Sequence, residues 1–329
     1  MKYLLFLFAL AVTVLVVSRA GNAGTSAKTS ESKPEVPAYW TSSRISRSDL
    51  PCDTPKSPVE FNVGNPRTQG NAYLLMAASH LAYRFWPGRR ERILKEWGFN
   101  SFRLFDNNQT STNGFWAEHE QFVLLVYRGT QEPTDLFTDA NVQLEKTPSK
   151  WLMPGRVHSG FFTAAQSVRE FTLEAALLAE SKRKPLVLAG HSLGGAVALL
   201  SAIELEKSGK HFQSLWTFGA PKTGEPAFTH AAKKILGKRL HTVIQPSDPI
   251  PLLPFEDDER DTLVQLAERY GTFLPLLKKI AANAEYESAP SASLHRRLTQ
   301  TSLKDFATGF WKHLPRSYVC DLADGKLAL

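Results

Sequence analysis

The chain of 329 residues lacks several features that would point to particular classes of protein. It has only two cysteines, Cys52 and Cys320, and neither lies in a metal-ligand spacing or a nucleophile motif, so a cysteine enzyme is not supported. No basic run is interleaved with aromatic residues, which argues against nucleic-acid binding. No repeat of solenoid period is present. Since 43% of the residues are hydrophobic, the chain can form one large core or two modest ones.

The N-terminus also lacks a long hydrophobic run. A short basic start precedes an apolar stretch at Leu4–Val17, which is brief for a membrane span, and small residues follow it. This pattern predicts a signal peptide over residues 1–23, cleaved after Ala20 or Ala23. We therefore expect a secreted or periplasmic protein. The alternative is a protein anchored in the membrane by residues 4–17.

The net charge of the chain remains positive after export. Cleavage would lower the formal charge from +7 to +5, because Lys2 and Arg19 are the only charged residues in the removed segment. A positive charge favours contact with an anionic membrane. A solvated surface with a small excess of basic residues is an equally good explanation of the charge.

In an oxidising compartment, Cys52 and Cys320 can form a disulfide. Two separate buried thiols are the alternative.

The rest of the chain divides into an arm and one domain. Residues 24–60 are rich in Ser, Thr, Pro and Lys and predict a linker or extended arm. Residues 61–329 predict a single catalytic domain in which helices and strands alternate. This alternation predicts an α/β fold, with a central, mostly parallel sheet and helices on both faces. The expected helices are 69–86, 161–178 and one from Glu225, and the expected strands are 122–127, 185–189, 215–218 and 240–244.

A G-x-S-x-G motif carries the clearest chemical signal. Residues 190–194 read Gly-His-Ser-Leu-Gly, between an apolar strand and a small-residue helix start. In this context the motif predicts a sharp turn that exposes a serine hydroxyl at the sheet edge. The alternative is a glycine-rich turn in which the serine occurs by chance and has no catalytic role. Ser192 is the predicted nucleophile.

A serine nucleophile needs a base and an acid that orients the base. Asp248 directly follows the strand 240–244, where site residues are expected, whereas the other candidate aspartates lie in a charged cluster at 257–261. His313 lies among aromatic residues near the C-terminus and is favoured over His295. His191 is expected to point away from the serine, and the remaining histidines are expected at surface or cap positions: His80, His119, His211, His230 and His241.

The tetrahedral intermediate needs backbone N–H donors. One is expected from Leu193, directly after the nucleophile. The second is expected from the loop that follows the strand 122–127, where Arg128, Gly129 and Thr130 stand.

Together these segments resemble the class 3, fungal-type lipases, which include phospholipases and feruloyl esterases. The resemblance covers roughly residues 65–320. It implies an α/β-hydrolase-like fold, with Ser192, Asp248 and His313 as the catalytic triad and Thr130 and Leu193 as oxyanion donors. The acyl-enzyme chemistry of such a triad calls for no cofactor and no metal. The matching segments, in the family's order, are 126–130, 157–161, 190–196, 217–224, 247–254 and His313 followed by Tyr318.

Two segments depart from the family pattern. The family's lid helix would fall at residues 131–139, which are acidic and lack the usual tryptophan. Residues 257–283 carry an apolar stripe at helical spacing, which predicts either a helix packed on the core or a flap over the acyl pocket or membrane.

The resulting prediction is a secreted serine lipase or esterase that hydrolyses carboxylic esters of triacylglycerol or phospholipid at a membrane or droplet surface. A soluble carboxylesterase, of feruloyl or short-chain type, is one alternative. A non-catalytic lipid-binding pseudo-hydrolase is the other.

Overall fold

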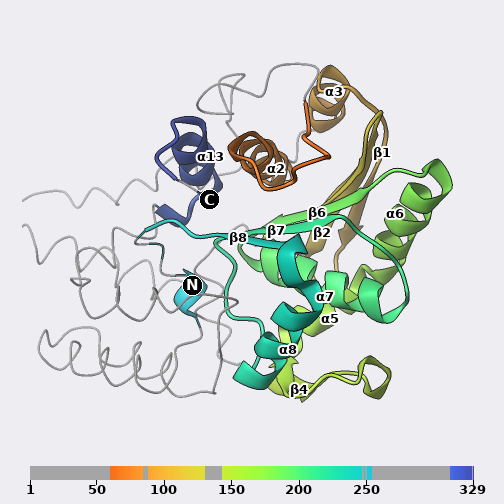
Figure 1. Ribbon diagram of the computed structural model, residues 1–329, viewed down its shortest axis with the longest axis vertical. Coiled ribbons are helices and arrows are strands. Elements are labelled where there is room, and N and C mark those ends of the chain that lie inside the picture. The colour runs from red at the N-terminus through yellow and green to blue at the C-terminus, as the bar shows by residue number, and fades with distance from the viewer. Residues whose placement is uncertain are drawn as a thin grey trace, which may run out of the picture.

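The computed structural model describes residues 60–83, 88–129, 143–246, 248, 250–253, 312–327 and 329 (Figure 1). Several sequence predictions lie outside these residues. They are the signal peptide 1–23, the arm up to residue 59, the oxyanion residue Thr130, and the two candidate lid segments 131–139 and 257–283.

A six-stranded mixed sheet forms the centre of the domain, in the order β1-β2-β3-β6-β7-β8. Three strands at one end pair antiparallel, and β3, β6, β7 and β8 are parallel neighbours, so the predicted mostly parallel sheet is confirmed. The strands are β1 (Phe99–Asn107), β2 (Thr112–His119), β3 (Val123–Tyr127), β6 (Leu186–His191), β7 (Ser214–Phe218) and β8 (Leu240–Val243).

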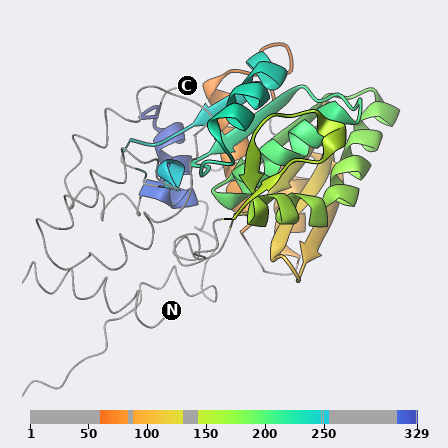
Figure 2. The same cartoon turned by 90° about the horizontal axis from the view of Figure 1, so that it is seen from below.

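Helices cover both faces of this sheet (Figures 1 and 2). Side chains alternate along β3: Val123 and Leu125 contribute to one buried cluster, and Leu124 and Val126 to the other. Strands buried on both faces therefore read as continuous apolar runs. The first cluster includes α5 (Ser159–Ser167), α6 (Arg169–Lys182), α7 (Leu193–Lys207) and α8 (Pro226–Leu236), and the second includes α2 (Gln69–Leu81), α3 (Arg89–Glu96) and α13 (Pro315–Ala323).

The single helix expected over 161–178 is two helices. α5 ends at Ser167 and α6 begins at Arg169, because Val168 between them has φ −117° and ψ 15°, outside the helical range. Buried Val168 packs into the core at this bend. A small second sheet precedes α5 and consists of β4 (Leu144–Lys146) and β5 (Arg156–His158). Short 3₁₀ turns lie at Ser149–Trp151, Gly237–Arg239 and Ile250–Leu252.

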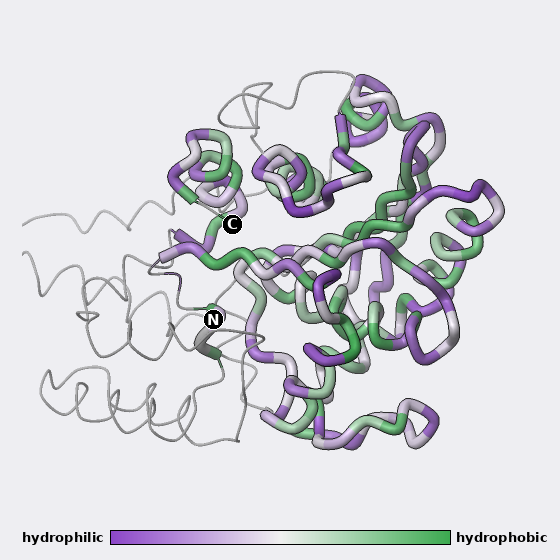
Figure 3. Tube along the Cα trace, in the orientation of Figure 1, coloured by the Kyte–Doolittle hydropathy of each residue, from purple (hydrophilic) through white to green (hydrophobic). Residues whose placement is uncertain are grey.

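Hydrophobic residues follow the central strands, whereas the helices alternate between hydrophobic and hydrophilic residues (Figure 3). Two histidines expected at the surface are buried instead. His119 packs edge-on against Phe99, and His241 lies tilted against Trp216 with a centroid separation of 4.3 Å. Both residues lie in strands of the central sheet, β2 and β8, and their side chains are therefore buried in the core.

The C-terminal helix α13 is tied to other parts of the chain. Gln69, at the start of α2, donates its side-chain amide to the backbone carbonyls of Leu322 and Leu327. Cys320 of α13 is disulfide-bonded, and the only other cysteine, Cys52, lies outside the described residues. Among the helices that the structure describes, none combines the length and apolar character needed to cross a membrane.

Candidate active site

Ser192 occupies the turn between β6 and α7. Its backbone has φ 58° and ψ −131°, a region that non-glycine residues rarely adopt. The Ser192 N–H donates to the carbonyl of Phe218 at 2.9 Å, which holds the turn against the end of β7. Strain of this kind persists only where the surroundings enforce it, and it is common at functional sites.

The motif's glycines allow close backbone contacts around this turn. A Cβ on Gly190 would lie 2.1 Å from the carbonyl oxygen of Gly194. A Cβ on Gly194 would lie 2.2 Å from the carbonyl oxygen of Tyr127, at the end of β3. Because both obstructions are backbone atoms, no side-chain movement relieves them. The two glycines of the motif are therefore required by backbone packing.

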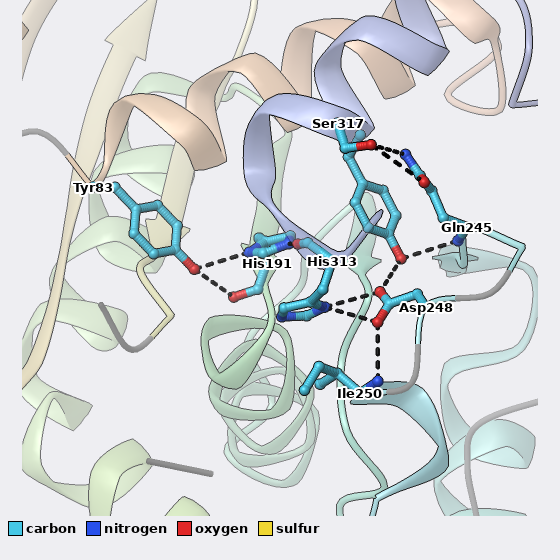
Figure 4. A network of polar contacts seen from close by, with 8 residues as sticks. Tyr83, His191, Gln245, Asp248, Ile250, His313 and Ser317 are labelled. Carbon is cyan, nitrogen blue, oxygen red and sulfur yellow. Dashed lines mark hydrogen bonds and ion pairs between the residues drawn. The ribbon is translucent and has the colours of Figure 1, made fainter. Parts of the chain in front are cut away.

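Asp248 and His313, 65 residues apart in sequence, lie side by side beyond the carboxyl ends of the strands (Figure 4). The Nδ1 atom of His313 is 3.0 Å from Oδ1 and 2.9 Å from Oδ2 of Asp248. Both side chains are fully buried. The carboxylate also accepts the Ile250 N–H on Oδ1 at 2.9 Å. Burial of this carboxylate is therefore compensated by several hydrogen bonds.

This contact decides which nitrogen of His313 carries the proton. A carboxylate only accepts hydrogen bonds, so in the neutral ring Nδ1 carries the proton and Nε2 keeps its lone pair. Among the described residues, neither Nε2 of His313 nor Oγ of Ser192 has a hydrogen-bond partner, and both atoms are buried. In this tautomer Nε2 has a free lone pair, and Oγ is a hydroxyl without a hydrogen-bond acceptor among the described residues.

Tyr318 is a site residue to which the sequence assigned no role. Its hydroxyl donates to Oδ2 of Asp248 at 2.6 Å and accepts the backbone N–H of Gln245 at 3.0 Å. Burial and the Asp248 carboxylate raise the pKa of Tyr318 well above its usual value, so the hydroxyl remains a donor. The position of Tyr318 in α13, five residues after His313, was the available signal.

The predicted oxyanion donors are described in part. Leu193 is the first residue of α7, where backbone N–H groups have no carbonyl partner within the helix. Gly129 lies against Ser192, since a Cβ placed on it would be 2.9 Å from Cβ of Ser192. Thr130 itself is outside the described residues, as are His295 and the aspartates at 257–261.

The expectation for His191 was incomplete. Its ring is buried and lies 4.7 Å from the ring of His313, centroid to centroid, and it contacts the backbone of that residue. The described ranges contain no group of three or more His, Cys, Asp or Glu residues that could hold a metal ion.

A serine on a strand–turn–helix elbow, beside a buried Asp–His pair at the strand ends, defines a site of the α/β-hydrolase type. Residues 124–258 match the family model described as lipase (class 3). The chain is similar to a lipase of Rhizomucor miehei, with 29% identity over 170 residues, which cover 50% of this chain and 44% of the relative. It is also similar to secreted mono- and diacylglycerol lipase 1 of Fusarium solani, with 38% identity over 101 residues, which cover 30% and 29% of the two chains.

These matches show that residues 124–258 are similar to the class 3 lipases. The alignments span less than half the length of either relative. A solved structure of the Rhizomucor miehei triacylglyceride lipase has a TM-score of 0.49 to this chain at 22% identity, covering 56% of this chain and 72% of that one.

Proposed function

We propose that the protein is a serine hydrolase that cleaves carboxylic esters of lipids through an acyl-enzyme. The observation that carries this proposal is the buried Asp248–His313 pair next to the elbow that bears Ser192. The similarity to lipases supports lipid esters as the substrate class. An orienting acid, a base with a free nitrogen and a hydroxyl are the groups that acyl transfer requires.

The proposed reaction begins when Oγ of Ser192 attacks the ester carbonyl and Nε2 of His313 takes the hydroxyl proton. Asp248 holds the ring in the required tautomer and stabilises the imidazolium that forms. The N–H of Leu193, with a donor at Thr130, stabilises the oxyanion. His313 then protonates the leaving alcohol, and the acyl group stays on Oγ of Ser192. A water molecule, deprotonated by His313, attacks the acyl carbonyl; the C–Oγ bond breaks, the acid leaves, and His313 returns the proton to Oγ of Ser192.

The site of action is part of the same proposal. We infer secretion or periplasmic export through residues 1–23, a domain over 61–329, and action at a membrane or droplet surface. Secreted lipases among the relatives support export. The basic net charge supports contact with an anionic surface.

The test is a comparison of purified mature protein with its Ser192→Ala variant. A fluorophosphonate probe should label the wild type and not the variant. Hydrolysis should then be measured on mono-, di- and triacylglycerols, on a phosphatidylcholine and phosphatidylglycerol pair, and on p-nitrophenyl butyrate below and above its solubility limit.

The outcomes separate the candidate functions. Ser192-dependent hydrolysis of acylglycerol or phospholipid supports the lipase proposal. Activity confined to soluble short esters would replace it with a carboxylesterase. Failure of the folded protein to react with the probe or any ester would replace it with a non-catalytic lipid-binding protein.

A further inference from the structure

His191 has both ring nitrogens engaged in hydrogen bonds (Figure 4). Nδ1 lies 2.9 Å from the hydroxyl of Tyr83, and Nε2 lies 2.8 Å from the backbone carbonyl oxygen of His313. The residue is the last of β6 and is 1% exposed. A histidine next to the nucleophile therefore contacts the backbone of the base that the nucleophile needs.

The chemistry of these partners determines where the protons are. A carbonyl oxygen can only accept, so Nε2 of His191 carries a hydrogen and donates it to His313. In the neutral ring Nδ1 is then an acceptor, and the hydroxyl of Tyr83 donates to it. Burial, with the neighbouring His313 and His80 as titratable groups, lowers the pKa of His191 well below its usual value, so the ring is neutral.

The hydroxyl of Tyr83 also lies against the loop that leads to the oxyanion residue. A Cβ on Gly129 would be 2.1 Å from this oxygen and 2.6 Å from the backbone oxygen of His191. Only a glycine leaves room for the hydroxyl at this position. Tyr83, two residues beyond the end of α2, thus lies between the end of β3 and the elbow.

We propose that Tyr83 and His191 are positioning residues for His313. The hydroxyl of Tyr83 donates to the ring of His191, and this ring donates to the backbone carbonyl of His313. These two hydrogen bonds hold the backbone of His313 in place. The proposal rests on the proposed function, in which His313 takes the serine proton. A neutral ring matters because its centroid is 4.7 Å from that of His313. A cation at that distance would oppose the imidazolium that forms on His313 during catalysis.

The first measurement does not depend on activity. In protein with ¹⁵N-labelled histidine, His191 should give the signals of a neutral ring protonated at Nε2, with no titration between pH 8 and 5. Its signals are assigned by their loss in His191→Gln. Protonation at Nδ1, or titration near the ordinary value for histidine, would overturn the proposal.

The second measurement uses the rate of p-nitrophenyl butyrate hydrolysis. Tyr83→Phe should lower kcat about tenfold with little change in KM, because one of these two hydrogen bonds is lost. His191→Leu should lower kcat about a hundredfold, because the base loses its backbone anchor. His191→Gln, whose amide can still donate to the carbonyl of His313, should recover most of that loss.

Two matched controls separate positioning from general destabilisation. Tyr127→Phe removes another buried tyrosine hydroxyl, which contacts Thr172 at 2.6 Å, and His241→Leu removes another buried histidine. Both should retain wild-type kcat. If wild-type hydrolysis depends on Ser192 and His313 but the folded Tyr83 and His191 variants keep full kcat, this proposal fails while the proposed function stands. Hydrolysis independent of Ser192 and His313 would instead refute the proposed function.

Discussion

Asp248→Asn is the most informative single perturbation of the site. The carboxylate of Asp248 accepts hydrogen bonds from three groups: Ile250 N–H on Oδ1, Tyr318 hydroxyl on Oδ2 and His313 Nδ1 within reach of both oxygens. An asparagine offers one oxygen and one NH₂ group. The backbone N–H of Ile250 cannot reorient, so the oxygen must stay at the Oδ1 position and the NH₂ group must take the Oδ2 position.

This placement favours the tautomer of His313 that is protonated at Nε2, because a proton on Nδ1 would face the NH₂ group as well as the oxygen at the Oδ1 position, 3.0 Å away. The NH₂ group would lie 2.9 Å from Nδ1 of His313, where the carboxylate oxygen was, and would donate to it. The ring proton then moves to Nε2, which can no longer accept the proton of Ser192. In the Ser-His-Asp template the same substitution lowers kcat about 10⁴-fold, and we expect a loss of ~10³- to 10⁴-fold here.

The assay is kcat for p-nitrophenyl butyrate together with thermal unfolding of each variant. Asp324→Asn is the matched control, since Asp324 is exposed and pairs only with Lys326 among the contacts described. It should retain wild-type kcat. A folded Asp248→Asn variant within tenfold of wild-type kcat would refute the assignment of Asp248 as the orienting acid.

Three further predictions concern the same fold and site. Tyr318→Phe should lower the free energy of unfolding by about 2 kcal/mol, measured by urea denaturation, and should lower kcat several-fold, because Asp248 and the N–H of Gln245 both lose a buried partner. An unchanged denaturation midpoint would contradict it. Gly194→Ala should destabilise by about 3 kcal/mol or more, since its Cβ would meet backbone 2.2 Å away, whereas Gly70→Ala, with open space around it, should be neutral or stabilising. Equal midpoints for the two alanine variants would exclude the packing argument. Burial lowers the pKa of His158 to about 4, from 6.5 for an exposed histidine. As the pH falls from 6.5 towards 4, His158 therefore binds a proton in the unfolded state but not in the folded state, and the folded protein loses stability. The loss should be about 2–3 kcal/mol by denaturation at each pH, and His158→Asn, which keeps an acceptor for the Phe161 N–H without titrating, should flatten that part of the curve.

Local sequence was sufficient for the fold class and for the elbow. Apolar runs of five or six residues bounded by turns predict strands buried on both faces, and β3, β6 and β7 lie where those runs are. The glycines around Ser192 are needed for contacts made mainly within the strand–turn–helix unit and with its neighbouring strand. Such contacts leave a pattern in consecutive residues, so the pattern can be read before the fold is known.

What the sequence could not provide was the set of partners brought together over long separations. The hydroxyl of Tyr83 meets a ring 108 residues away, and that of Tyr318 meets a carboxylate 70 residues away. No local spacing signals either contact. The burial of His119 and His241 was missed for the same reason, because side-chain environment depends on which elements pack over a strand. The tertiary structure alone decided these features, since burial and hydrogen bonding depend on proximity in space.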